Sequence, residues 1–199
     1  MVAVYNYGYV AKLIIIGDMG CGKSSLLRQF TEDTFVKRFR SVTRSYYRGS
    51  IGTIFVYDIT NRESFESLDK WMVDARQLTA PHSIFVLVGN KADQESRRVV
   101  SVAEGEKYAR QNDMLFVEAS AKTGEKVDST FLTLASRIVQ LVKDGIVDPM
   151  APDSGVQSKK PQDALAAASA VAVAKNNPRA VQVNSEASSR FSFGMGGCC

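Results

Sequence analysis

The sequence is poor in the residues that build disulfide frameworks and zinc sites. Two of its three cysteines, Cys198 and Cys199, are adjacent at the end of the chain and cannot staple a fold. The single histidine, His82, leaves no Cys/His set for a structural zinc ion. These shortages exclude a disulfide-stabilised secreted domain and a zinc finger, and they favour a reducing compartment.

Long hydrophobic runs are also missing. No segment approaches the ~18 consecutive apolar residues of a membrane-spanning helix, and the longest candidate, 164–174, is mostly alanine and is interrupted by Ser169. Residues 1–10 have neither a basic start nor a small-residue cleavage site, so we expect no secretory signal. The net charge is only +4. This profile predicts one cytosolic globular domain with additional chain.

The composition changes near residue 144. Residues 145–199 hold four of the five prolines but only two aromatic residues, Phe191 and Phe193. Such a stretch cannot bury enough apolar surface to offset the conformational entropy that it would lose on ordering. The sequence therefore predicts a folded domain over 1–144 and a disordered, flexible tail over 145–199.

Within residues 1–144, apolar runs alternate with amphipathic stretches. The expected strands are 11–16, 51–57, 83–89 and 114–117, and the expected helices are 23–31, 63–77, 102–111 and 126–142. The strand runs are continuously apolar, which is typical of parallel strands covered on both faces. The predicted fold class is α/β, with an open, mainly parallel sheet between helices. We assign Trp71, at helical spacing, to core packing.

A phosphate-binding motif directly follows the first expected strand. Residues 17–24 read GDMGCGKS and match G-x-x-x-x-G-K-S between a strand and a helix. Glycines let backbone N–H groups approach phosphates, and the start of a helix adds its positive dipole end. We expect Lys23 to reach the β- and γ-phosphates, Ser24 to ligate Mg²⁺ and Cys21 to act as a small filler. The loop residues predicted to bind nucleotide are Gly17, Asp18, Met19, Gly20, Cys21, Gly22, Lys23, Ser24 and Ser25.

Two further motifs end later strands. Residues 88–93 read VGNKAD and residues 118–122 read EASAK, and the carboxyl ends of strands are where open α/β sheets bind ligands. The carboxylate of Asp93 can accept hydrogen bonds from the ring N–H and the exocyclic amine of guanine, a pair of donors that adenine lacks. The sequence therefore predicts selection of guanine.

Together these motifs resemble a Ras-like small GTPase of the Rab branch, with a P-loop NTPase-type sheet. GDMGCGKS, NKAD and EASAK occur in the family's order, and residues 38–49 (RFRSVTRSYYRG) are similar to the Rab second switch region. The terminal Cys198 and Cys199 resemble a double-geranylgeranylation signal. The resemblance implies that the guanine base is bound or contacted by the following residues: Phe35, Asn90, Lys91, Asp93, Ser120, Ala121 and Lys122.

A segment typical of the family is missing between Lys37 and Arg38. Similar proteins carry there the first switch with its Mg²⁺-binding threonine, an antiparallel hairpin and a W-D-T-A-G-Q-E segment, on the order of 40 residues. We therefore assign no catalytic residue, expect strand 12–16 to become an uncovered edge, and retain Ser24 as the only metal ligand. Met19 fills a loop position that is usually small, and we expect its thioether to crowd the γ-phosphate.

Asp58 has two interpretations. From the residues alone, its place after the apolar run 54–57 is that of the Mg²⁺-holding aspartate of a P-loop NTPase. The resemblance instead places residues 58–61 (DITN) one strand further on, where Asp58 caps a loop. We prefer the second interpretation, because the neighbouring residues match on both sides.

The function implied by the resemblance is a GTP/GDP-binding, Mg²⁺-using regulator of vesicle-mediated, endosomal protein transport. It would sit on the cytoplasmic face of endosome or Golgi membranes through lipid, partly cytosolic, with Rab escort protein and geranylgeranyl transferase as partners. The missing first switch puts GDP dissociation inhibitor, exchange factors, effectors and GTPase activity in question. Alternatives are a prenylated decoy from a shortened transcript, or a nucleotide kinase, which has no use for NKAD. No nucleic-acid partner is expected, because the basic residues of 37–48 lack a stacking platform.

Overall fold

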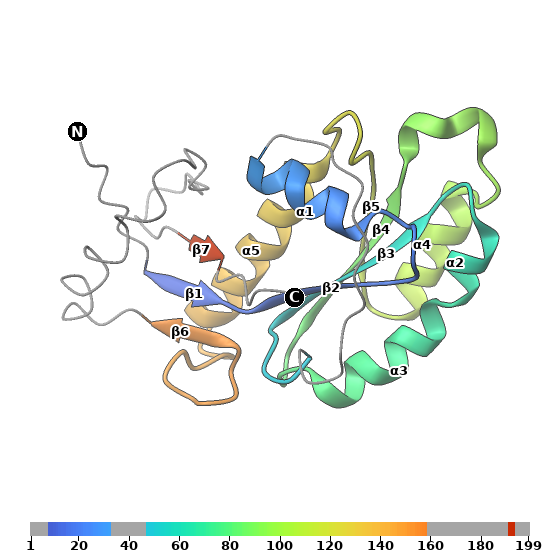
Figure 1. Ribbon diagram of the computed structural model, residues 1–199. Coiled ribbons are helices and arrows are strands. Elements are labelled where there is room, and N and C mark those ends of the chain that lie inside the picture. The colour runs from blue at the N-terminus through green and yellow to red at the C-terminus, as the bar shows by residue number, and fades with distance from the viewer. Residues whose placement is uncertain (1–7, 33–46, 159–190, 194–199) are drawn as a thin grey trace, which may run out of the picture.

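A four-stranded parallel sheet forms the centre of the protein (Figure 1). The structure is a computed structural model, and it describes residues 8–32, 47–158 and 191–193. The strands are β2 (Leu13–Ile16), β3 (Gly52–Asp58), β4 (Ile84–Asn90) and β5 (Leu115–Ala119), in the order β2-β3-β4-β5 with every neighbouring pair parallel. All seven residues of β3 are buried. The predicted open parallel sheet is confirmed.

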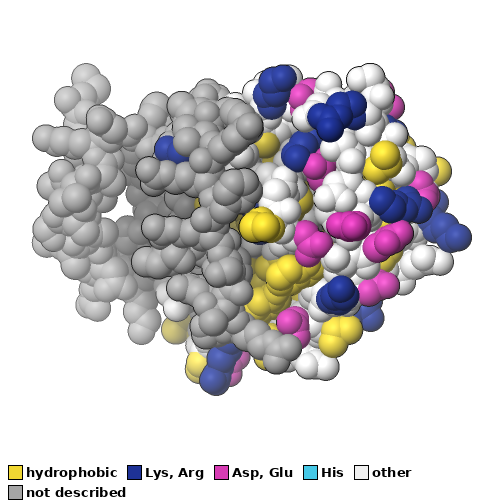
Figure 2. Space-filling model, turned by 45° about the vertical axis from the view of Figure 1, so that its right-hand side comes forward, with side chains coloured by type: hydrophobic (Ala, Val, Ile, Leu, Met, Phe, Trp, Pro, Cys, Tyr) yellow, Lys and Arg dark blue, Asp and Glu magenta, His cyan; other side chains and the backbone are white. Residues whose placement is uncertain are grey.

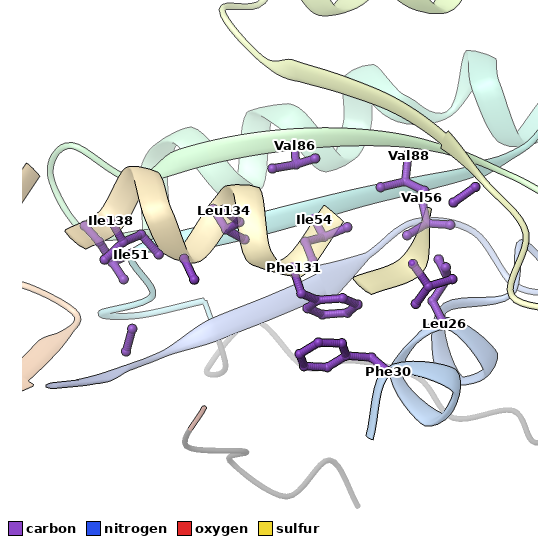
Figure 3. Packing of buried hydrophobic residues seen from close by; sticks show 14 of the residues in the cluster. Leu26, Phe30, Ile51, Ile54, Val56, Val86, Val88, Phe131, Leu134 and Ile138 are labelled. Carbon is purple, nitrogen blue, oxygen red and sulfur yellow. The ribbon is translucent and has the colours of Figure 1, made fainter. Parts of the chain in front are cut away.

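Helices α1 (Lys23–Glu32) and α5 (Val127–Lys143) cover one face of this sheet (Figure 1). Figure 3 shows their packing against β3 and β4, with the rings of Phe30 and Phe131 stacked at a centroid distance of 4.1 Å. The labelled core residues from these elements are Leu26, Phe30, Ile54, Val56, Val86, Val88, Phe131, Leu134 and Ile138. Burying a large apolar side chain stabilises the fold by about 1.5–3 kcal/mol, so this layer holds the start of α1, and the loop before it, against the sheet.

The opposite face is covered by α2 (Arg62–Glu66), α3 (Leu68–Leu78) and α4 (Val102–Gln111) (Figure 1). Phe55 and Tyr57 of β3 pack there with Leu68 and Met72 of α3. Successive strand residues point to opposite faces, so the intervening Ile54 and Val56 serve the first core while these two serve the second. Because helices cover both faces of the sheet, β3 is apolar along nearly its whole length.

The amphipathic stretch expected over 63–77 is two helices. Asn61 caps α2, because its side-chain oxygen accepts from the N–H of Glu63 at 3.0 Å. At Ser67 the backbone ladder tightens: Ser67 N donates to Glu63 O, but Lys70 N donates to Ser67 O, only three residues back. This shorter step separates α2 from α3.

Short strands missed by the sequence lie at the other end of the molecule. β1 (Tyr9–Ala11) pairs antiparallel with β6 (Val156–Ser158) and parallel with β7 (Phe191–Phe193). Lys12 separates β1 from β2 and uses both backbone groups, donating to Gly155 O and accepting from Ile51 N. The expected strand 11–16 is therefore divided between two sheets.

The packed part of the chain extends past the expected boundary at residue 144. Val147 and Val156 are buried in the same core as α1 and α5, so residues 145–158, expected as flexible linker, contribute to the domain. The same stretch also pairs with β1 through β6. Residues 159–190 and 194–199 of the expected tail lie outside the described residues.

The edge of the main sheet is β2, which pairs with β3 alone among the described strands; the loss of an edge hairpin stays a prediction. None of the described helices combines the length and apolar character that crossing a bilayer requires. The face of the described chain in Figure 2 carries acidic and basic side chains interspersed, rather than one large patch of either sign.

Candidate nucleotide-binding site

The register of the parallel sheet brings the predicted motifs to one edge. Asp58, Asn90 and Ala119 are aligned partners at the carboxyl ends of β3, β4 and β5. The loop after β2 leaves the same edge, because β2 runs parallel to β3. This is the edge at which open α/β sheets bind ligands.

Two glycines of the phosphate loop have no room for a side chain. Gly17 has φ 139°, and a Cβ there would lie 2.1 Å from the carbonyl oxygen of Val56. Gly22 has φ 95°, and a Cβ there would lie 2.2 Å from Nδ2 of Asn90. Both positive φ values and both close approaches demand glycine, so the loop can wrap tightly between β3 and β4.

The loop itself orients Lys23. Its Nζ donates to the carbonyl oxygens of Gly17 at 2.9 Å and Asp18 at 2.7 Å. An ammonium has three N–H donors: two fix the direction of the side chain, and Nζ also lies 3.8 Å from Sγ of Cys21, a weak acceptor that a phosphate oxygen would replace.

A phosphate fits this loop. Gly20, with φ 82°, has open space where a side chain would stand. The backbone N–H groups of Gly20, Gly22, Lys23 and Ser24 make no hydrogen bond within the described part of the chain, as expected at the start of a helix. Ser24 is exposed on the first turn of α1, where its hydroxyl would hold Mg²⁺, an ion that neutralises phosphate charge. The described residues contain no group of three His, Cys, Asp or Glu that could hold a metal.

Cys21 and Met19 occupy contrasting places in the loop. Cys21 is buried, and this burial raises the pKa of its thiol, so the side chain stays protonated and fills space. Met19 is 83% exposed. The crowding of a γ-phosphate by Met19 stays a prediction. Ser25 is buried in the first turn of α1.

Asn90 ties the phosphate loop to the EASAK loop. It is buried, its Nδ2 donates to the carbonyl oxygen of Cys21 at 2.8 Å, and its Oδ1 accepts from the backbone N–H of Ala121 at 3.1 Å. The resemblance assigns both Asn90 and the Ala121 N–H to the guanine. In the structure these groups bond to one another, and they fix the distance between the two loops.

Asp93 is held from the neighbouring strand end. Its Oδ1 accepts from the hydroxyl of Ser120 at 2.6 Å, and Nζ of Lys122 lies 3.8 Å from its Oδ2. The Ser120 hydroxyl also accepts from the N–H groups of Lys122 and Thr123. The carboxylate predicted to select the base is therefore fixed in direction, with further lone pairs for two base donors.

Asp58 caps a loop, as the preferred interpretation predicts. Its Oδ1 accepts from the N–H of Thr60 at 2.8 Å and from the Thr60 hydroxyl at 2.7 Å. Its Oδ2 is paired with Nζ of Lys91. Lys91 was expected beside the base, and in the structure its charge is held by Asp58 at the same edge of the sheet.

Two contacts at this edge were not predicted. Arg98 donates to both carboxylate oxygens of Glu118, at 2.7 and 2.8 Å, and both side chains are largely buried. Glu118 opens the EASAK motif and Arg98 follows the 3₁₀ turn Ala92–Arg97 that carries Asp93, so this pair joins the two base-side loops. Trp71, assigned to the core, donates from Nε1 to Oδ1 of Asp18 at 2.9 Å. The only sequence signal for the Arg98–Glu118 pair was the acidic residue that opens the EASAK motif. Nothing in the residue spacing indicates the Trp71–Asp18 contact.

Three predicted site residues lie outside the described residues: Phe35, Cys198 and Cys199. The same holds for most of the basic stretch 37–48.

Comparison with known proteins identifies the family. The sequence model of the Ras family matches residues 12–41 and 36–140, which together are more than half of the chain. The chain belongs to the Ras family. Its two matched stretches meet at residues 36–41, the place of the expected missing segment, whose loss stays a prediction.

Within the family the protein is of the Rab type. Ras-related protein Rab-4B from Rattus norvegicus, from Homo sapiens and from Mus musculus is in each case 38% identical over 185 residues, covering 76% of this chain and 87% of the relative. The Rab-type resemblance and the P-loop GTPase fold are confirmed. Proteins of this family generally bind GTP and GDP with Mg²⁺.

Proposed function

We propose that this Rab-type chain binds GDP and GTP at the carboxyl edge of its sheet and selects guanine through Asp93. The observation that carries the proposal is the bridge made by Asn90, from Cys21 O to Ala121 N. A phosphate loop alone serves many nucleotides. A buried amide that couples this loop to a second, base-side loop supports a site built for phosphates and base together.

The arrangement around Asp93 supports the choice of base. Ser120 donates to Oδ1 and leaves the carboxylate able to accept from the ring N–H and the exocyclic amine of guanine. Adenine offers no such pair of donors, and a base that leaves the carboxylate unmatched loses binding energy.

We further propose that GTP hydrolysis by this chain is much slower than by an intact family member. The sequence lacks the water-orienting glutamine, the switch threonine and the metal-holding aspartate that the resemblance places in the missing segment. Lys23 and the loop N–H groups bind ground state and transition state alike, which supports affinity more than rate.

The proposed cellular role is supported by the family and by the paired cysteines Cys198 and Cys199. We propose lipid attachment at Cys198 and Cys199 by geranylgeranyl transferase with Rab escort protein, and a role on the cytoplasmic face of endosomal membranes in vesicle transport. Two isoprenoid chains give stable anchoring where one gives marginal binding. Replacing both cysteines by serine should leave the protein cytosolic in cell fractionation, and a double variant that still sediments with membranes would contradict this attachment.

Fluorescent GDP tests the nucleotide proposal. The purified full chain should bind N-methylanthraniloyl-GDP, and unlabelled GDP should displace it far better than ADP. Lys23→Ala should weaken binding about tenfold to hundredfold, because it removes a charged hydrogen-bond donor. Lys107→Ala, at an exposed lysine of α4, is the matched control and should bind normally. Equal displacement by ADP, or no binding, would overturn the proposal; a folded chain that binds no nucleotide is what the decoy alternative predicts.

A further inference from the structure

The only tryptophan of the chain connects helix α3 to the phosphate loop. Trp71 and Asp18 are 53 positions apart, yet Nε1 of Trp71 lies 2.9 Å from Oδ1 of Asp18. The indole packs against the second core, which includes Phe55 and Leu87 of the sheet. The donor thus belongs to a fixed element, whereas the acceptor belongs to a loop.

Asp18 also holds the lysine that the loop presents to a ligand. Its carbonyl oxygen accepts from Nζ of Lys23 at 2.7 Å and from the N–H of Cys21 at 3.5 Å. Its carboxylate makes no hydrogen bond to the described chain other than the one from Trp71. Fixing this side chain therefore limits how far the peptide that orients Lys23 can turn.

We propose that Trp71 is a positioning residue of the phosphate loop. Its N–H holds Asp18, and through the Asp18 carbonyl it keeps Lys23 in the orientation that binds the phosphates of a guanine nucleotide. The inference rests on the proposed function, because it names a residue that supports the same site from outside the motif. Its consequence is that a change on α3, far from the loop in sequence, alters how long nucleotide stays bound.

A purely structural role for this contact makes a different prediction. Trp71 is half-buried, so water can serve its N–H when Asp18 is changed, and helix packing alone would then set the effect of any substitution. Met72, the next residue on α3, is buried and contacts the same core. Met72→Ala therefore weakens the packing of α3 without touching the loop, and is the matched control.

Nuclear magnetic resonance on ¹⁵N-labelled protein tests the contact itself. A chain with one tryptophan gives one indole N–H signal. Asp18→Ala should move this signal and speed its exchange with water, while Asp18→Asn, which keeps an amide oxygen as acceptor, should leave it slow to exchange. An indole signal that does not respond to Asp18→Ala would overturn the proposal before any nucleotide is added.

Nucleotide release tests the positioning role. Trp71→Phe and Asp18→Ala should each speed GDP release about tenfold, the effect of losing one hydrogen bond to a charged group. The double variant should be no faster than either single one, because the two changes remove the same interaction. Asp18→Asn, which keeps an acceptor for the indole N–H, should speed release less than Asp18→Ala does, and Met72→Ala should lower the unfolding midpoint with release unchanged.

The outcomes separate the two proposals. If the unaltered protein binds no guanine nucleotide, the proposed function fails and takes the positioning role with it. If GDP binds but Trp71→Phe releases it no faster than Met72→Ala does, only the positioning role is overturned. Additive acceleration in the double variant would also overturn it, because the two residues would then act separately.

Discussion

Replacing Asn90 by alanine should destabilise the protein more than the loss of most single polar side chains. The change removes two buried hydrogen bonds and leaves the carbonyl of Cys21 and the N–H of Ala121 without their partner. A buried polar group left unsatisfied costs about 1–3 kcal/mol, so the two together predict about 2–6 kcal/mol. A domain of this kind is stabilised by only about 5–15 kcal/mol in total.

Urea unfolding, followed by far-ultraviolet circular dichroism, measures this loss. The matched control is Asn112→Ala, which removes an amide that donates to Tyr108 O at 3.0 Å from a half-buried position at the end of α4. Water can replace that bond, so we expect about 0.5–1.5 kcal/mol there. GDP release should accelerate in Asn90→Ala but not in Asn112→Ala, since of these two residues only Asn90 bridges the two loops.

The predicted role of Asn90 would be refuted if Asn90→Ala lowered the free energy of unfolding no more than Asn112→Ala does, with the slope of that free energy against urea concentration unchanged. Such a result would mean that the two loops keep their separation without the amide. The buried position of Asn90 would then reflect packing only.

Three further outcomes are expected. Arg98→Ala should lower the free energy of unfolding by about 2–3 kcal/mol, because it leaves the largely buried carboxylate of Glu118 without its ion-pair partner. Urea unfolding measures this loss, and a loss below about 1 kcal/mol would contradict the prediction. Hydrogen bonding by Arg62 lowers the pKa of Glu104 to about 2 from 4.5, so its contribution to stability is present above pH 4.5 and lost as the pH falls toward 2. The difference in melting temperature between the unaltered protein and Glu104→Gln should close over that range. Chelation with EDTA should change GDP release little, because Ser24 is the only metal ligand predicted, and a large acceleration would reveal a second one.

The central sheet could be predicted because its strands are long and apolar throughout. The run 51–57 anticipates β3 (Gly52–Asp58) within a residue at each end, since both faces of this strand are buried. The common location of the motif loops could be predicted as well, because a parallel sheet brings the carboxyl ends of all its strands to one edge. The loop-capping role of Asp58 was predicted because the residues on both sides of it match the family, and its bonds to Thr60 agree with that role.

What escaped prediction depends on contacts between distant segments. Strands β1 and β6 are three residues each, too short for a periodic pattern, and their pairing joins segments that are far apart in the sequence. The burial of Val147 and Val156 beyond the expected boundary has the same cause. Trp71 sits at helical spacing and does pack against a core, but periodicity says nothing about where its N–H points.

We propose that Asp93 reads the base, and exchanging its carboxylate for an amide is the sharpest test of this role. Competition of GDP and xanthosine diphosphate for the site should be measured on the unaltered protein and on Asp93→Asn. We expect the unaltered protein to prefer GDP and the variant to prefer xanthosine diphosphate, because the substitution turns one acceptor into a donor and the xanthine base replaces the amine with a carbonyl. A variant that still prefers GDP by the original factor would show that Asp93 does not select the base.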